Sequence, residues 1–259
     1  MAKPIIITGA SSGIGYELAK VCAAKGHDLV LIARREDRLL GLKDSLQAAH
    51  GVQVLTYRGD LTDANTRYQF FDWTQFKGIT PYGLINNAGF GALAPFAETD
   101  WDQQNAMLQL NIVALTHLTR LYLPSMIAQG QGRILNMASI AAFLPGSYMA
   151  VYYASKAYVL SFTDALATEL EGTGVTATTL CPGPTESEFQ DKAAMQNVAM
   201  FDAKNLPTSG DVAIYGYQAM EKGQRIAVHG TKNKMLTLVT RLLPRKKLAE
   251  ISRDTQKPA

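Results

Sequence analysis

Short apolar runs alternate with longer amphipathic stretches along most of the chain. The runs are rich in Ile, Val and Leu and lack a polar alternation, which is typical of strands buried on both faces of a sheet. Strands are predicted at residues 4–8, 29–33, 52–58, 83–85, 133–138, 175–180 and 225–229. Because the stretches between them have helical periodicity, the pattern predicts an α/β domain with a parallel sheet.

Helices are predicted at residues 16–25, 37–49, from near Thr62, and at 101–127, 152–170 and 211–222. Asn111 lies inside the long helix 101–127, although asparagine is a weak helix former. One interpretation is a local break whose backbone and amide hold a water beside Lys156. The other is a hydrogen bond at a helix interface.

A glycine-rich loop, GASSGIG, lies between the first strand and the first helix. Gly9, Gly13 and Gly15 let the backbone approach a pyrophosphate, and the helix N-terminus beyond them supplies free N–H donors. A tight turn without a ligand is the alternative. The position of the loop favours dinucleotide binding.

Two arginines follow the second strand and suggest which dinucleotide is bound. Ala33 occupies the place where NAD enzymes tend to carry an acid for the ribose hydroxyls, and Arg34 and Arg35 come next. Guanidinium groups suit a dianionic 2′-phosphate, so we predict NADP(H). The alternative is a solvated pair, or salt bridges to Glu36 and Asp37.

The next two strands also end in groups suited to a ligand edge. Asp60 can accept a hydrogen bond from an adenine amino group, or it can cap the helix near Thr62. The sequence 86–89, Asn-Asn-Ala-Gly, leaves room for a cofactor ribose beside the backbone.

The stretch 139–156 carries the candidate chemistry. Tyr152 and Lys156 are four residues apart, so on a helix they share one face. A nearby cation favours the phenolate and lowers the pKa of the tyrosine, which then exchanges a proton with a substrate oxygen. Ser139, at the end of a strand, can orient that oxygen. Taken alone, the Tyr-x-x-x-Lys spacing favours an ordinary helix surface, because short patterns recur by accident.

Composition excludes several other classes of protein. The 259 residues are 47% hydrophobic and 18% charged with a net charge of +3, which indicates a globular protein and no nucleic-acid partner. Cys22 and Cys181 lack metal spacing and predict reduced core thiols, and no metal is expected. No apolar stretch is long enough to span a membrane, and no secretion signal precedes the first strand, so we expect a cytoplasmic protein.

Two later segments depart from the regular pattern. Residues 184–210 lack periodicity but carry Phe189, Met195, Met200 and Phe201, which predicts a substrate lid or, alternatively, core packing. From Gly230 onward there are eight Lys or Arg and two acids. This basic amphipathic tail, 231–259, suits either an anionic membrane surface or packing on the lid or a neighbouring subunit, and we favour packing.

Together these motifs resemble the short-chain dehydrogenase/reductase family over roughly residues 3–230. The matching positions are Thr8-Gly9-x-x-x-Gly13-x-Gly15, Asn86-Asn87-Ala88-Gly89, Asn111, Ser139, Tyr152-x-x-x-Lys156 and Pro182-Gly183. The resemblance implies a single Rossmann-fold domain (1–230), a doubly wound seven-stranded parallel sheet with helices on both faces. It also implies a homodimer or homotetramer formed through helices 101–127 and 152–170.

The resemblance further implies the roles of individual residues. Asn111, Ser139, Tyr152 and Lys156 would form the catalytic tetrad: Tyr152 exchanges the proton, Ser139 positions the substrate oxygen, and Lys156 binds the nicotinamide ribose and connects through water to Asn111. Ser139, Tyr152 and Phe189 would contact substrate. The implied cofactor contacts are Gly9, Ser11, Ser12, Gly13, Ile14, Gly15, Arg34, Arg35, Asp60, Leu61, Asn87, Ala88, Gly89, Tyr152, Lys156, Pro182, Gly183, Thr185 and Ser187.

The implied function is an NADP(H)-dependent oxidoreductase that interconverts a carbonyl and an alcohol by hydride transfer. Reduction of a hydrophobic ketone or ketoacyl substrate is favoured, since the apolar residues of 184–210 suggest an apolar ligand and the branch near ketoacyl and hydroxysteroid reductases is the most similar. The alternative is a non-catalytic dinucleotide sensor or scaffold protein.

Overall fold

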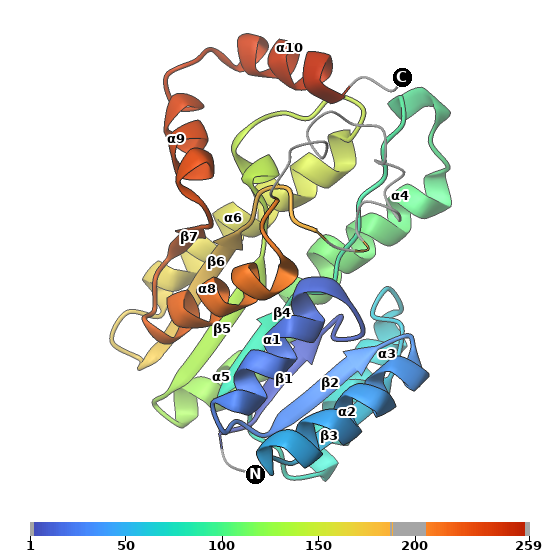
Figure 1. The fold of residues 1–259 in the computed structure, drawn as a ribbon, viewed down its shortest axis with the longest axis vertical. Coiled ribbons are helices and arrows are strands. Elements are labelled where there is room, and N and C mark those ends of the chain that lie inside the picture. Colours follow the sequence, from blue (N-terminus) through green and yellow to red (C-terminus); the bar gives the residue numbers. More distant parts are fainter. Residues whose placement is uncertain (1–2, 187, 189–205, 257–259) are drawn as a thin grey trace.

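The computed structural model describes residues 3–186, 188 and 206–256 and contains one seven-stranded parallel sheet (Figure 1). The strand order is β3-β2-β1-β4-β5-β6-β7, so the direction of winding reverses between β1 and β4. The strands are β1 (Ile5–Thr8), β2 (Leu29–Ala33), β3 (Val54–Arg58), β4 (Gly83–Asn86), β5 (Gly132–Met137), β6 (Val175–Cys181) and β7 (Ile226–Val228). The predicted fold class is therefore confirmed.

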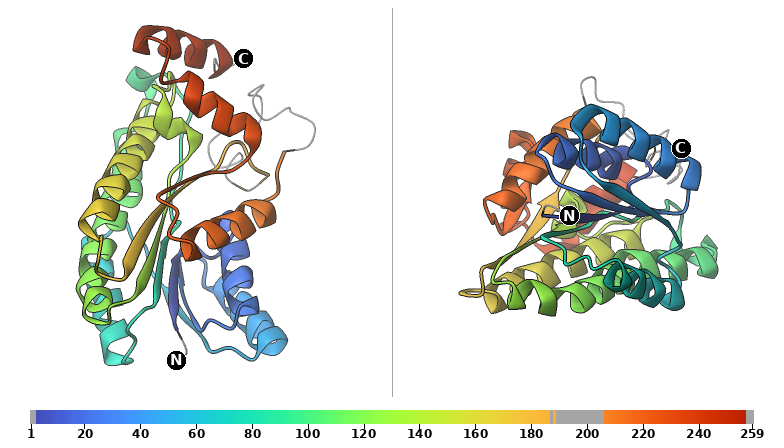
Figure 2. Two further views of the ribbon diagram at one scale, coloured as in Figure 1. Left: turned by 90° about the vertical axis from the view of Figure 1, so that its left-hand side faces the viewer. Right: turned by 90° about the horizontal axis from the view of Figure 1, so that it is seen from below.

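Helices cover both faces of the sheet (Figure 2). One layer holds α1 (Gly13–Ala24), α2 (Glu36–His50) and α8 (Ser209–Glu221), and the other holds α3 (Ala64–Phe76), α4 (Trp101–Leu108), α5 (Leu115–Ala128) and α6 (Ala150–Glu169). Alternate residues of β1 serve the two layers. Ile5 and Ile7 belong to the apolar core beneath α1, whereas Ile6 packs with Phe70 and Tyr122 on the opposite face.

The predicted continuous helix 101–127 is wrong in one respect, because α4 and α5 are separated by a π-helical turn, Gln109–Ala114. Asn111 lies in this turn. Its side chain accepts a hydrogen bond from the Phe90 amide (3.1 Å) and donates to the Phe90 carbonyl (2.9 Å) and to the Ser155 hydroxyl (3.1 Å). The wider turn and these hydrogen bonds occur together, so a local break and an interface hydrogen bond are both present, while the water beside Lys156 stays a prediction.

The tail forms two helices, α9 (Thr231–Val239) and α10 (Arg245–Gln256), beyond the last strand. They lie at the end of the molecule where α6 begins (Figure 1). Most of the predicted lid, including Phe189, Met195, Met200 and Phe201, lies outside the described residues. Within the part of the chain that is described, no helix has the length and apolarity needed to cross a bilayer.

Thr8 joins the two strands at the point where the winding reverses. Its hydroxyl accepts hydrogen bonds from the amides of Asn87 (3.0 Å) and Ala88 (2.9 Å) and donates to the carbonyl of Ile85 (3.4 Å). Thr8 is buried, so these amides have little access to replacement water.

We expect Thr8→Val to lower the free energy of unfolding by about 2 kcal/mol, because the Ala88 amide loses its acceptor and the Asn87 amide keeps only the Ile85 carbonyl, at 3.1 Å. Thr8→Ser keeps the hydroxyl and should lose less than half as much. Denaturant titration followed by circular dichroism measures both variants. Equal stability of Thr8→Val and the wild type would show that the hydroxyl contributes nothing at this junction.

Candidate active site

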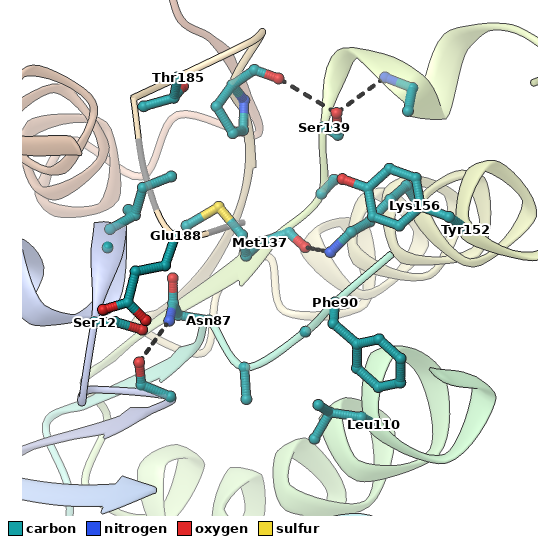
Figure 3. A pocket seen from close by; sticks show the side chains of 18 of the residues that line it. Ser12, Asn87, Phe90, Leu110, Met137, Ser139, Tyr152, Lys156, Thr185 and Glu188 are labelled. Carbon is teal, nitrogen blue, oxygen red and sulfur yellow. Dashed lines mark hydrogen bonds between the residues drawn. The ribbon is translucent and has the colours of Figure 1, made fainter. Parts of the chain in front are cut away.

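A cavity of about 370 Å³ opens at the carboxyl edge of the sheet, where β1 and β4 diverge (Figure 3). Ligands of open parallel sheets bind at such a switch point. Residues from nine separate segments line it. Those predicted from the sequence are Gly9, Ser11, Ser12, Gly13, Ile14, Arg34, Arg35, Asp60, Leu61, Asn87, Ala88, Gly89, Ser139, Tyr152, Lys156, Pro182, Gly183 and Thr185. Of the other predicted site residues, Gly15 and Asn111 do not line the cavity, and Ser187 and Phe189 lie outside the described residues.

The glycine loop is built for close backbone packing. Gly9 has a φ of +68°, in the left-handed region. A side chain at Gly15 would place its Cβ 2.3 Å from the side-chain nitrogen (Nδ2) of Asn87 and 2.5 Å from the backbone carbonyl oxygen of Gly9. Asn87 holds the loop by donating to the carbonyls of Thr8 (3.0 Å) and Gly9 (3.3 Å). Asn87 therefore has a structural role at the cavity in addition to the predicted cofactor contact.

Helix α1 begins at this loop with its N-terminus uncapped by a side chain. Ser12 is the N-cap residue, yet its hydroxyl makes no hydrogen bond to the first turn. The first-turn N–H groups have no partner within the helix and carry its positive dipole end. This arrangement suits the pyrophosphate of a dinucleotide.

The two arginines differ in their surroundings. The Arg35 guanidinium donates to the Ser11 hydroxyl (3.3 Å) and carbonyl (3.2 Å) and pairs with Glu188 at 3.0 Å. Arg34 is more exposed and lies 3.6 Å from the Asp60 carboxylate. The alternative pairing with Glu36 is wrong, because Glu36 pairs with Arg58 across neighbouring elements.

Asp60 does not cap the following helix. Asp63 caps α3 by accepting from the Thr66 amide at 2.8 Å. Asp60 instead accepts from the amide and hydroxyl of Thr62, at 3.0 and 2.9 Å, and so closes a local turn at the cavity. The capping interpretation is therefore wrong, and Asp60 remains a candidate contact for the adenine end.

Ser139, Tyr152 and Lys156 meet at the other end of the cavity (Figure 3). Ser139 follows β5, accepts from the Ala141 amide at 3.1 Å and shares a hydrogen bond with the Tyr152 phenol. The Lys156 ammonium donates to the Met137 carbonyl at 2.8 Å and lies 5.6 Å from the centre of the Tyr152 ring. A carbonyl oxygen within reach of both hydroxyls would meet two hydrogen-bonding groups.

The pKa shifts of this pair correct one expectation. Burial raises the pKa of Tyr152, and the hydrogen bond with Ser139 opposes the rise only in part. Burial lowers the pKa of Lys156 to about 8. Desolvation therefore sets the direction of the Tyr152 shift, and the predicted lowering of the tyrosine pKa is wrong for this state of the site.

Asn111 and Lys156 approach each other across Gly89. A Cβ built on Gly89 would lie 3.0 Å from the side-chain oxygen (Oδ1) of Asn111 and 3.4 Å from the side-chain nitrogen (Nζ) of Lys156. Only glycine at position 89 leaves the side chains of Asn111 and Lys156 where they are. Asn111 thus fixes the loop after β4 through Phe90 and borders the space beside the lysine.

Sequence reasoning missed the apolar wall of the cavity, formed by Phe90, Leu110, Met137, Leu144, Met149 and Leu236. It also missed Tyr153 and Glu188. The apolar residues Leu144 and Met149 flank the loop before α6, and their position next to Tyr152 in the sequence was the available signal. In the structure Met149 belongs to a small buried cluster with Ala141 and Tyr153, and Leu144 packs against it. Within the described residues, no group of three or more His, Cys, Asp or Glu is arranged to hold a metal ion.

Comparison with known families matches residues 3–197 to the short chain dehydrogenase family. A sulfoacetaldehyde reductase of Chromohalobacter salexigens is 36% identical over 225 residues, which cover 82% of this chain and 86% of that protein. A very-long-chain 3-oxoacyl-CoA reductase of Phaeosphaeria nodorum is 35% identical over 176 residues, or 66% of this chain. The matched region spans 51% of that fungal protein's length.

Among solved structures, a short-chain dehydrogenase from Sphingobium yanoikuyae in complex with NADPH superimposes with a TM-score of 0.82 and 28% identity. The superposition covers 92% of this chain and 93% of that one. Three observations point to the same family: the order of the motifs, the strand order of the sheet and the match over residues 3–197. The chain therefore belongs to the short-chain dehydrogenase/reductase family.

Proposed function

We propose that the protein is an NADP(H)-dependent oxidoreductase that reduces the carbonyl group of a ketone or aldehyde to an alcohol. One observation carries the proposal: Ser139, Tyr152 and Lys156 meet in the same cavity as an uncapped glycine loop suited to a pyrophosphate. A non-catalytic sensor would need the loop but not this group of proton-exchanging side chains.

The dinucleotide, when bound, supplies the hydride. Tyr152 then acts as the general acid toward the carbonyl oxygen, because its raised pKa keeps the phenol protonated at neutral pH. Ser139 orients that oxygen through its hydroxyl. Lys156 holds positive charge beside the developing alkoxide and binds the nicotinamide ribose, while Pro182, Gly183 and Thr185 line the nicotinamide end. Asn111 and a water would connect the lysine to solvent.

NADP(H) is the proposed cofactor because Arg35 presents a fixed guanidinium at the adenine end of the cavity. Ser11 orients this group, so little freedom is lost when a phosphate binds. The Sphingobium relative holds NADPH in its structure, which supports the same choice here.

An apolar ketone or ketoacyl compound is the proposed substrate class. Phe90, Leu110, Leu144 and Met149 surround the Tyr152 end of the cavity, and Leu236 of α9 adds a further apolar side chain. The fungal relative acts on very-long-chain 3-oxoacyl-CoA, which supports this class, whereas the relative from Chromohalobacter acts on the small anionic sulfoacetaldehyde. The apolar wall favours the first of these chemistries.

We also propose a homodimer or homotetramer formed through α4, α5 and α6, where Trp101 of α4, Val113 of the π-helical turn and Tyr158 of α6 are exposed. Residues 1–230 would form the catalytic domain, with 184–210 as substrate lid.

A cytoplasmic location is proposed because Cys22 and Cys181 are both buried, unbridged thiols, as expected in a reducing compartment.

We expect Tyr152→Phe to lower kcat for NADPH-dependent reduction of a long-chain ketone by about 100-fold or more, because the general acid is lost. NADPH affinity should remain within about threefold of wild type. Tyr153→Phe, one residue away on α6, is the matched control and should retain most activity. Full activity of Tyr152→Phe would contradict the mechanism. Faster wild-type turnover of sulfoacetaldehyde than of the ketone would contradict the substrate class.

The reaction should depend on pH through Lys156. Its ammonium is the proposed active form, and its pKa of about 8 means that the charge is lost as pH rises through 8, while the Tyr152 phenol stays protonated. We therefore expect kcat/KM for reduction to be constant below about pH 7 and to fall about tenfold per pH unit well above 8. In Lys156→Arg the guanidinium stays charged, so any residual activity should lack this fall. A flat wild-type profile up to about pH 10 would exclude Lys156 as the controlling group.

We expect Arg35→Ala to weaken NADPH binding about tenfold or more and to leave NADH binding nearly unchanged, because only NADPH carries the 2′-phosphate. Glu188→Gln should strengthen NADPH binding a few-fold, because the phosphate no longer competes with a carboxylate for Arg35. Arg38→Ala, on the exposed surface of α2, is the control. Fluorescence titration with both dinucleotides measures these affinities. Equal losses for NADPH and NADH in Arg35→Ala would rule out a phosphate contact.

A further inference from the structure

Helix α9 has the reverse of the usual amphipathic arrangement. Thr237, on the side facing the protein, is only 8% exposed, and Thr240, just beyond the helix, is buried as well. Met235 is 64% exposed, Leu238 59% and Leu242 84%. A surface helix normally turns its apolar residues inward. Here burial of polar residues and exposure of apolar ones coincide within one short segment.

The exposed apolar residues lie together on one side. At 3.6 residues per turn, Met235, Leu236, Leu238 and Val239 fall within about half of the helix circumference, opposite Thr237, and the exposed Leu242 follows in the turn beyond the helix. We call this group of five the α9 apolar face. Large exposed apolar residues that cluster on a soluble domain mark a contact surface rather than a random scatter.

The charged residues of the segment 231–247 are all cationic, and one of them, Lys247, pairs with Glu250 of α10 at 3.5 Å. Residues 231–247 contain six Lys or Arg and no Asp or Glu. Lys232, Lys234 and Arg241 belong to α9 and its end, and Arg245, Lys246 and Lys247 form the exposed first turn of α10. An apolar face bordered by cations matches a lipid surface in which acyl chains lie below anionic headgroups.

The segment is anchored to the domain beside the cavity. Leu248, Ser252 and Gln256 of α10 are buried, and the Gln256 amide donates to the Tyr153 phenol next to Tyr152. At the other end, Asn233 packs on Gly183 and donates to the His229 carbonyl at 2.7 Å. Leu236 belongs both to the α9 apolar face and to the lining of the cavity. The exposed face is therefore continuous with the proposed substrate site.

We propose that the α9 apolar face and the bordering cations of residues 232–247 dock the protein onto an anionic membrane surface. A second copy of the chain is a poorer occupant, because a two-fold contact through this face would bring twelve cations together, six from each copy, without an intervening acid from 231–247. Docking would place the cavity mouth at the acyl chains, from which an apolar substrate can enter. Only this last consequence rests on the proposed function.

Sedimentation with vesicles tests the proposal without measuring turnover. Vesicles of phosphatidylcholine alone are compared with vesicles that also contain phosphatidylglycerol. We expect the full chain to bind the anionic vesicles about tenfold or more tightly than the neutral ones, and less tightly as salt screens the charges.

Two sets of variants separate the apolar and charged contributions. Met235→Ser/Leu238→Ser/Leu242→Ser and Arg245→Gln/Lys246→Gln should each weaken binding to anionic vesicles about tenfold. These five residues do not line the cavity, so reduction of a small water-soluble ketone should be unchanged and reports correct folding. The controls are Leu40→Ser/Phe76→Ser and Lys25→Gln/Lys77→Gln, which change exposed residues on other helices or their ends.

Lack of wild-type binding to anionic vesicles would overturn the proposal, as would equal losses in the control variants. Analytical ultracentrifugation provides the remaining outcome. If the Met235→Ser/Leu238→Ser/Leu242→Ser variant forms a smaller species than the wild type and neither binds vesicles, the face is an interface between copies and the membrane proposal is wrong.

Discussion

The site depends on how closely the backbone segments after β1 and β4 can approach each other. Gly9 and Gly15 leave no space for a Cβ, and Thr8 and Asn87 join the two segments by hydrogen bonds. This contact fixes the start of α1 and thereby the direction of its free N–H groups. It also fixes the path of residues 88–90, against which Asn111 and Lys156 are placed. The two ends of the cavity therefore share one structural origin.

Burial has opposite effects on the pKa values of the two titratable groups of the site. It raises that of Tyr152, so the phenol stays protonated, as a proton donor requires, and it lowers that of Lys156 to about 8, which limits the pH range in which the lysine keeps the charge that the proposed reaction uses. The Met137 carbonyl accepts from the lysine, so the ammonium is not left without a hydrogen bond in a buried position. A deeply buried cation would otherwise be costly.

The C-terminal helices connect the catalytic end of the cavity with the molecular surface. α10 packs on the domain itself through Leu248, Ser252 and Gln256, the last of which contacts Tyr153, while α9 exposes its apolar residues. The expected packing of the tail on the lid or a neighbouring subunit stays a prediction. The same segment supplies Leu236 to the cavity that Tyr152 also lines, so a contact that displaced α9 would change the shape of this cavity.

The sequence by itself determined the order of strands and helices, because buried parallel strands are continuous apolar runs that need no knowledge of their partners. It also determined the shared face of Tyr152 and Lys156, since four-residue spacing is a local property of a helix. Tertiary structure decided what depends on neighbours distant in the chain. The π-helical turn at Asn111 goes with bonds to Phe90 and Ser155, Arg35 is oriented by Ser11 and Glu188, and the raised pKa of Tyr152 reflects desolvation by surrounding segments. The side of α9 that faces solvent was likewise undetermined, because periodicity locates an apolar face but not what packs against it.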